Sequence, residues 1–264
     1  MNFFTFKFFS IALSLCVTLL LLMAILSLFF VPKFEEVLEA LQSSEMLYSL
    51  KLSLMTASLS TLLVIAVAIP IAYALSRYDF FGKAILKTVM NLPMAFPELV
   101  LGLALLLLFS RTYVGDLLHY FGISIVFTKS AIVIAQFFTA LPYAIRIVYA
   151  AFEGISKRYE NVSRSLGYTE FQTFKNITIP LVRNGIYAST IITFARTMGA
   201  FGAVLILAGG TYMKTEILPI TLFLNISYGN LGMAITSGIV LITISFIAIL
   251  FFEYMEGKKS VFED

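Results

Sequence analysis

The sequence contains little charge for its length. Of its 264 residues only 12% are Asp, Glu, Lys or Arg, whereas 60% are hydrophobic. Soluble domains average about 25% charged and about 45–50% apolar residues, so this chain has too little polar surface to cover a water-soluble globule of its size. The composition therefore disfavours a soluble enzyme, a nucleic-acid-binding protein and a disordered chain, and it indicates an integral membrane protein.

Cysteine and histidine are also scarce. The chain has one cysteine, Cys16, and one histidine, His119. A single cysteine cannot form a disulfide within the chain, and the two residues together cannot build a typical zinc site. The sequence has neither the H-E-x-x-H motif of a metalloprotease nor a G-x-x-x-x-G-K-[ST] phosphate loop. We therefore expect no catalytic residues, no metal site and no cofactor in this chain.

Long apolar runs are what the sequence has instead. A helix needs about 20 mainly apolar residues to cross the hydrocarbon layer. The qualifying stretches are uniformly apolar rather than alternating, unlike the strands of a membrane barrel. We predict an all-α membrane protein, with residues 1–264 as a single transmembrane domain and the first run as a retained span. The six predicted transmembrane helices are 8–31, 51–76, 89–110, 130–152, 184–208 and 232–252.

Lys and Arg residues are distributed unevenly along the chain. If the N-terminus is cytoplasmic, eleven of the 18 fall on the cytoplasmic side, five fall outside, and Arg146 and Arg196 fall within predicted spans. Cytoplasmic loops of membrane proteins carry an excess of Lys and Arg, so we predict that both termini are cytoplasmic. The longest cytoplasmic segment between two spans is then 153–183, which is too short to hold a core of its own.

Segment 153–183 has clear local signals. Gly167 is a helix stop, Thr169 and Gln172 have the spacing of a capping box, and Pro180 suits the first turn of the following long helix. These residues predict two short helices, and they leave open whether the segment is a surface linker or a docking element. The first helix carries an apolar stripe at positions i, i+4, i+7 and i+11, formed by Ile155, Tyr159, Val162 and Leu166.

This segment resembles the EAA loop of ABC-importer permeases, whose pattern is E-A-A, three residues, G, nine residues, then I-x-L-P. Gly167, Ile177 and Pro180 stand at the matching positions, whereas Asn161 stands where the family has Glu, with Glu160 beside it. In the family this loop docks on the ATP-hydrolysing subunit. The resemblance implies that the coupling residues are Asn161, Val162, Ser163, Leu166, Gly167, Ile177 and Pro180.

A second resemblance concerns the fifth predicted span. Residues 195–203, A-R-T-M-G-A-F-G-A, are similar to the A-R-x-x-G-E-F-G-A stretch of molybdate, tungstate and sulfate permeases, with Ala200 in place of the Glu. Residues 92–102, 207–210 and 214–219 are similar to the same group. The resemblance implies a multi-pass permease subunit in the cell membrane that forms the translocation pathway for an oxyanion.

The same resemblance implies substrate and partners. Molybdate or tungstate is the expected substrate, and sulfate or another small solute is the alternative. The expected partners are a second permease copy, ATPase subunits that bind ATP and Mg²⁺, and an external substrate-binding protein. An ion-coupled carrier is less favoured because such carriers often place acidic residues in several spans, whereas Glu98 is the only acidic residue within the six.

Charged and small residues within the spans are the candidates for the translocation path or its gate. Arg196 is expected about halfway along 184–208, where it faces the path or pairs with Glu98. Gly199 and Gly202, spaced along the same helix, would allow another helix to approach closely. Arg146 lies nearer the end of its span, where it can extend to the interface, and no role is assigned to it.

Overall fold

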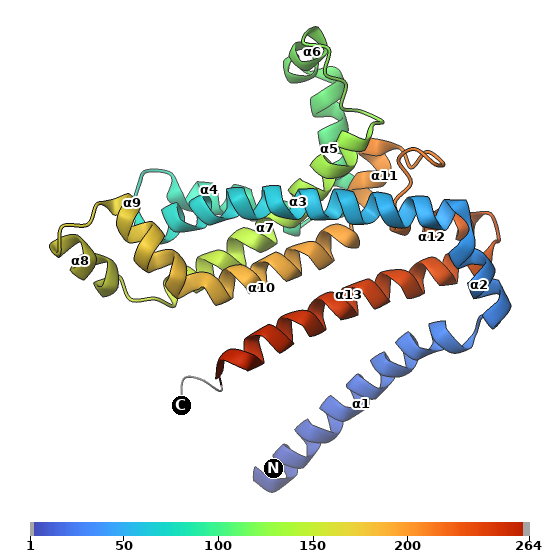
Figure 1. Ribbon diagram of the computed structural model, residues 1–264, viewed down its shortest axis with the longest axis horizontal. Helices are drawn as coiled ribbons and strands as arrows, with labels where there is room; N and C mark the ends of the chain where they lie inside the picture. The colour runs from blue at the N-terminus through green and yellow to red at the C-terminus, as the bar shows by residue number, and fades with distance from the viewer. Residues whose placement is uncertain (1–2, 261–264) are drawn as a thin grey trace.

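The computed structural model describes the backbone of residues 3–260 and the side chains of residues 6–251. Within the described backbone the chain is helical and has no strand, which confirms the all-α prediction (Figure 1). Four of the described helices are long and apolar enough to cross a membrane, and they coincide with four predicted spans. These are α1 (Phe3–Phe30), α3 (Ser44–Arg77), α7 (Lys129–Glu153) and α13 (Leu231–Ser260).

The third predicted span is sharply broken rather than continuous. It consists of α4 (Lys83–Asn91), the 3₁₀ turn η1 (Leu92–Met94) and α5 (Glu98–Arg111), and the axis bends by 111° before α5. Pro93 and Pro97 explain the break, because proline lacks a backbone N–H and disfavours a helical residue before it. The expectation of one transmembrane helix over 89–110 was therefore wrong, although the two prolines in its sequence mark the place of the break.

The fifth predicted span is also broken. Its first part runs without interruption from Glu170 to Met198, and a bend of 57° separates it from α11 (Gly202–Ala208). A single helix over 184–208 was therefore a wrong expectation, and Gly199 and Gly202 do not lie along one helix. The first part comprises α9 (Glu170–Thr173), the π-helical turn η2 (Phe174–Thr178) and α10 (Ile179–Met198).

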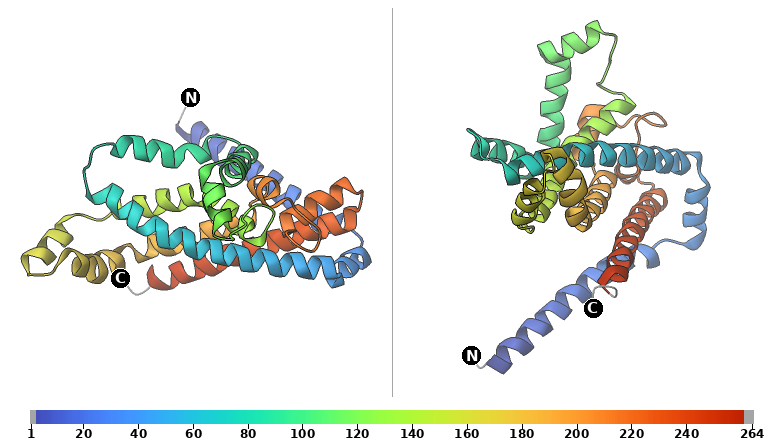
Figure 2. Two further views of the ribbon diagram at one scale, coloured as in Figure 1. Left: turned by 90° about the horizontal axis from the view of Figure 1, so that it is seen from above. Right: turned by 60° about the vertical axis from the view of Figure 1, so that its left-hand side comes forward.

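The short helices lie at the two ends and on one side of the molecule (Figures 1 and 2). Helix α8 lies beside α9 at one end, whereas α2 and α12 lie at the end where α3 begins. Helices α5 and α6 project sideways as an arm, and α1 diverges from the other long helices, with no residue of its apolar window buried. The short helices are α2 (Phe34–Gln42), α6 (Tyr113–Tyr120), α8 (Arg158–Ser165) and α12 (Leu218–Ser227).

The centre of the fold is the packing of α3, α7 and α10. Small buried side chains, such as Ala68 on α3 and Ala144 on α7, allow the helices to approach closely. A buried polar chain adds to this packing: the Ser60 hydroxyl donates to Gln136 Oε1 at 3.0 Å, and Gln136 Nε2 donates to the carbonyl of Thr197 at 3.1 Å. One side chain thus ties all three helices together away from water.

Helices α5 and α11 pack backbone against backbone. A Cβ atom added to Gly102 of α5 would lie 2.8 Å from the Cα of Ala203, and one added to Gly202 of α11 would lie 3.0 Å from the backbone nitrogen of Leu99. Side chains at these two positions would force the helices apart. The two broken spans are therefore held in close contact where their second halves begin.

Candidate functional site

The residues of segment 153–183 form the local structure that their signals predict at its first turn. Helix α8 ends at Ser165, and Gly167 has φ +92°, a left-handed conformation that favours glycine. The capping box is present, because the Gln172 N–H donates to Thr169 Oγ1 at 3.2 Å and the Thr169 N–H donates to Gln172 Oε1 at 2.9 Å. The turn between α8 and α9 is thus defined by local chemistry.

The second short helix does not end as predicted. Helix α9 continues through the π-helical turn η2 into α10, which makes one rod from Glu170 to Met198. Pro180 lies in the first turn of α10, directly after η2. A π-helical turn changes the hydrogen-bond register at this point, and the helical backbone continues through the proline without interruption. Segment 153–183 therefore consists of one short helix, α8, and the beginning of the long helix that ends at Met198.

One face of α8 presents apolar side chains outward. Tyr159, Val162 and Leu166 are 58%, 52% and 75% exposed, whereas Ile155 is partly buried and packs against the core. The exposed side chains line a groove with a volume of about 460 Å³. It contains four of the predicted coupling residues, while Asn161, Gly167 and Pro180 lie outside it. It is lined by Arg158, Tyr159, Val162, Ser163, Leu166, Tyr168 and Ile177.

The opposite face of α8 is joined to the membrane helices by a buried ion pair. Arg77 Nε, at the end of α3, lies 2.8 Å from Glu160 Oε1, and the two side chains are only 4% and 8% exposed. Thr178 of η2 donates its hydroxyl to the same carboxylate oxygen at 3.0 Å. Glu160 therefore connects α8 to both α3 and the α9–α10 rod.

Glu160 is the functional residue that the motif alignment passes over. The alignment places Asn161 at the position of the family's Glu, but Asn161 is exposed and its side chain accepts a hydrogen bond from Arg164 on the same helix. Helical phase could have found it. If Tyr159, Val162 and Leu166 face outward, Glu160 and Ser163 share the inward face, and Ser163 does contact Thr173 there at 3.0 Å.

A second ion pair joins the two broken spans. Arg196, in the last turn of α10, places Nη2 2.8 Å from Oε1 of Glu98, the first residue of α5. The other carboxylate oxygen of Glu98 accepts the backbone N–H groups of Phe201 and Gly202 at 3.3 Å each. The two side chains are 38% and 25% exposed, so the pair is held in place and still open to its surroundings.

In the structure Arg196 and Glu98 are paired, and both lie at the breaks of their predicted spans. Arg196 lies in the last turn of α10, beside the break in the fifth predicted span, and its guanidinium also lies 4.7 Å from the centre of the Tyr143 ring on α7. Glu98, Arg196 and Gly202 come together at the two breaks. Gly199 is exposed at the end of α10 and is not in close contact with another helix.

The loop after α11, which includes part of the stretch at 214–219, has a structural role. Thr215 Oγ1 accepts the Thr211 N–H and donates to the carbonyl of Ala208, both at 2.9 Å. Glu216 is almost fully buried and accepts the Met213 N–H at 3.2 Å, and burial raises the pKa of its carboxyl group. These contacts brace the loop, and they do not form a site of their own.

Comparison with known proteins places most of the chain in one family. Residues 64–261 match the family described as the binding-protein-dependent transport system inner membrane component. A probable molybdenum ABC transporter permease protein of Haloferax volcanii is 35% identical over 75% of this chain and 71% of its own length. The molybdate/tungstate transport system permease protein of Methanocaldococcus jannaschii is 31% identical over 95% of this chain and 99% of its own.

Sulfate permeases are similar at the same level. The sulfate transport system permease protein of Salmonella typhimurium is 32% identical over 67% of this chain, and the match spans 64% of that relative. Among solved structures, a bacterial alginate ABC transporter in complex with its alginate-bound periplasmic protein has a chain with a TM-score of 0.75, 18% identity and coverage of 95% of this chain and 93% of its own. This likeness supports the fold.

Replacing one member of the Arg77–Glu160 pair is expected to destabilise the protein more than replacing both. Arg77→Met or Glu160→Met leaves one buried charge without its partner, which costs about 3–5 kcal/mol in comparable pairs. The double variant leaves none. Retention of monodisperse protein after heating measures the difference, with Lys83→Met, which breaks the surface Lys83–Asp79 pair, as a control expected to change little. Equal losses in single and double variants would contradict this prediction.

Proposed function

The chain belongs to the family of binding-protein-dependent transport system inner membrane components, and we propose that it forms the translocation pathway of an ATP-driven importer of a tetrahedral oxyanion. It is a multi-pass membrane protein, and its relatives are transport permeases rather than enzymes. ATP hydrolysis, with ATP and Mg²⁺, belongs to a separate partner subunit. The family match and the relatives' printed functions support this proposal.

Molybdate or tungstate is the substrate that we favour, and sulfate is the alternative. Relatives named for either kind of anion are 31–35% identical to this chain, so identity does not separate them. The molybdate/tungstate permease matches over nearly the whole length of both chains, whereas the Salmonella sulfate permease matches over 64% of its own length. The near-complete match to this one relative is the observation that favours the heavier oxyanions.

The observation that carries the proposal is the coupling module formed by α8. Its outer face is an exposed apolar groove, and its inner face is locked by Glu160 to α3 and to the α9–α10 rod. An ATPase subunit that holds Val162 and Leu166 would move α8, and the buried ion pair would carry that displacement into two membrane helices. A surface linker would have no need of a buried ion pair.

The remaining features of the assembly follow from this arrangement. If each bent helix pair counts as one span, the chain has six spans, and both termini and α8 lie in the cytoplasm. Helices α2 and α12 then lie on the outer side, where an external substrate-binding protein delivers the anion. The unburied window of α1 and the α5–α6 arm offer apolar surface to the bilayer and to a second permease copy.

The Glu98–Arg196 pair is proposed as the gate. The rod from Glu170 to Met198 has α8 at one end and Arg196 at the other, so a displacement of the docking helix changes the position of the arginine relative to Glu98. A guanidinium is always charged and binds planar or tetrahedral anions through several N–H groups. When Glu98 and Arg196 separate, the arginine can receive the oxyanion.

Leu166 replacement is expected to remove the ATPase subunit from the purified complex. Leu166→Ser deletes the most exposed apolar side chain of the α8 groove, which the permease fold itself does not bury. The measurement is the amount of ATPase that co-purifies with tagged permease, expected to fall at least tenfold. Tyr212→Ser, which removes a similarly exposed side chain from the loop after α11, is the control. Undiminished co-purification of the Leu166 variant would contradict the docking proposal.

Arg196→Gln is expected to reduce oxyanion uptake by proteoliposomes at least tenfold while leaving the amount of assembled complex unchanged. The substitution removes the charge that Glu98 and the anion would share. Arg111→Gln is the matched control, because Arg111 also lies in the last turn of a helix in a broken span and is exposed. If Arg196→Gln assembles normally and transports at the parent rate, Arg196 is not part of the gate.

Substrate choice is tested on the external binding protein, which sets most of the selectivity in such importers. Calorimetric titration with molybdate, tungstate and sulfate is expected to give the tightest binding for molybdate or tungstate, by at least tenfold over sulfate. Affinity for sulfate above that for both other anions would establish the alternative substrate. Binding of none of the three would remove the oxyanion proposal and leave the family membership intact.

A further inference from the structure

Helix α7 carries a row of polar and aromatic side chains that the gate does not account for. Tyr143, Arg146 and Tyr149 follow one another at intervals of three residues, so they occupy neighbouring positions on successive turns with a rise of about 4.5 Å each. Tyr143 contacts Arg196 of the gate, and Tyr149 lies nearer the end of α7 that leads to α8. The row therefore runs from the gate toward the proposed cytoplasmic side.

Each of these three residues of α7 is a cation or lies beside one. The Arg196 guanidinium lies 4.7 Å from the Tyr143 ring centre, and Lys87 Nζ of α4 lies 4.1 Å from the Tyr149 ring centre and donates to the Tyr149 hydroxyl at 2.8 Å. Arg146 supplies the middle cation itself. Cations over aromatic rings are stabilised by the ring electrons, so the two tyrosines hold the outer cations in place without neutralising them.

The charges of this row are not balanced within the subunit. Arg196 is paired with Glu98, but in the part of the chain that the structure describes neither Lys87 nor Arg146 has a carboxylate within ion-pair distance. The side chains within residues 6–251 also provide no hydrogen-bond partner for Arg146. Arg146 is exposed near the proposed cytoplasmic end of α7, and Lys87 is half-buried on α4. Both positive charges are therefore available to an anionic ligand on the cytoplasmic side.

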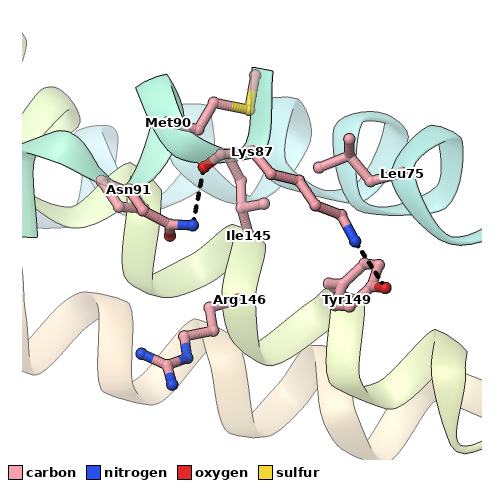
Figure 3. Close-up of a pocket in the computed structure, with 8 residues that line it drawn as sticks. Leu75, Lys87, Met90, Asn91, Ile145, Arg146 and Tyr149 are labelled. Carbon is pink, nitrogen blue, oxygen red and sulfur yellow. Dashed lines mark hydrogen bonds between the residues drawn. The ribbon is translucent and has the colours of Figure 1, made fainter. Parts of the chain in front are cut away.

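The two cations line one pocket between α4 and α7 (Figure 3). Its volume is about 450 Å³, and Leu75, Met90 and Ile145 form its apolar walls. The polar lining residues, besides the two cations, are Asn91 and Tyr149. In Figure 3 the Lys87 ammonium lies at the Tyr149 hydroxyl, whereas the Arg146 guanidinium lies on the side of Asn91, so the two cations border the pocket from different sides.

The pocket offers donors to a ligand that only accepts. Lysine and arginine have no acceptor atoms, and because Lys87 donates to the Tyr149 oxygen, the Tyr149 hydroxyl proton remains free to donate. Asn91 uses one amide hydrogen on the carbonyl of Lys87 and has a second one. A fully deprotonated tetrahedral oxyanion has four acceptor oxygens, two negative charges and no donor. Its charge equals that of Lys87 and Arg146 with opposite sign.

We propose that this pocket, formed by Lys87, Asn91, Arg146 and Tyr149, is a binding station for a doubly charged tetrahedral oxyanion on the cytoplasmic side of the Glu98–Arg196 gate. The inference rests on the proposed function in assigning the anion to transport. After the gate opens, the anion passes from Arg196 along α7 to Arg146 and Lys87. The station holds the dianion before its release into the cytoplasm. It disfavours movement of the anion back to Arg196, because the anion would have to leave two cations.

Equilibrium binding of radioactive molybdate and sulfate to the purified permease–ATPase complex, without binding protein, tests the station. Arg146→Gln and Lys87→Gln are each expected to weaken anion affinity at least tenfold, since each removes a positive charge and its charge-assisted hydrogen bonds to the anion. Arg146→Lys should restore most of the affinity. Lys83→Gln is the matched control, because Lys83 lies one turn before Lys87 on α4 but is paired with Asp79. Binding by Arg146→Gln equal to that of the parent would overturn the station.

A phospholipid phosphate offers similar chemistry, because basic pockets between membrane helices also bind lipid headgroups. Mass spectrometry of lipids retained by the same complexes separates the two sources. Retained anionic lipid that is lost in Arg146→Gln, with unchanged affinity for molybdate and sulfate, would make this a lipid site and overturn the proposal. Lipid retention that is equal in parent and variant, with anion affinity lost, supports the oxyanion station.

Uptake by proteoliposomes separates failure of the station from failure of the proposed function. If the parent imports neither molybdate, tungstate nor sulfate, the proposed transport function fails, while loss of anion binding in Arg146→Gln still supports the site. If the parent imports one of them and both variants bind and import it normally, the station is overturned and the function stands. The supporting result is uptake reduced at least fivefold in both variants, with Lys83→Gln within twofold of the parent.

Discussion

The arrangement of the broken spans depends on the contacts that the carboxylate of Glu98 makes. One oxygen binds Arg196 at the end of α10, and the other accepts two N–H groups at the start of α11. A helix broken inside a bilayer exposes backbone donors that hydrocarbon cannot satisfy. One acidic side chain from another broken span satisfies them and compensates a charge as well. The second halves of both spans can then pack with almost no side chain between them at Gly102 and Gly202.

The second constraint is that continuous structure links α8 to the Glu98–Arg196 pair. Glu160 joins α8 to the membrane helices with little exposure to water, so its attraction to Arg77 is weakly screened. The α9–α10 rod, which is helical from Glu170 to Met198, then extends to Arg196. The path from α8 to Arg196 thus consists of continuous helix with an ion pair at each end, Arg77–Glu160 and Glu98–Arg196.

Sequence reasoning reached the features that depend on composition or on local chemistry. Hydropathy located the apolar runs, and the glycine stop at Gly167 and the capping box after it are formed by residues close in sequence. Pro93 and Pro97 mark the first break, but hydropathy does not report the direction of a helix axis, and 89–110 stays apolar through a 111° bend. Sequence reasoning left the Glu98–Arg196 pair as one of two alternatives, since nothing local brings residues 98 positions apart into contact.

The π-helical turn before α10 has a consequence for the angular phase of the whole rod. Each residue of an α-helix advances the side-chain direction by about 100°. A turn with one extra residue therefore rotates all later side chains about the helix axis relative to those before it. Arg196 stands roughly five turns beyond η2, and its direction toward both Glu98 and Tyr143 follows from that reset. The length of this one turn therefore decides the direction in which the Arg196 side chain points.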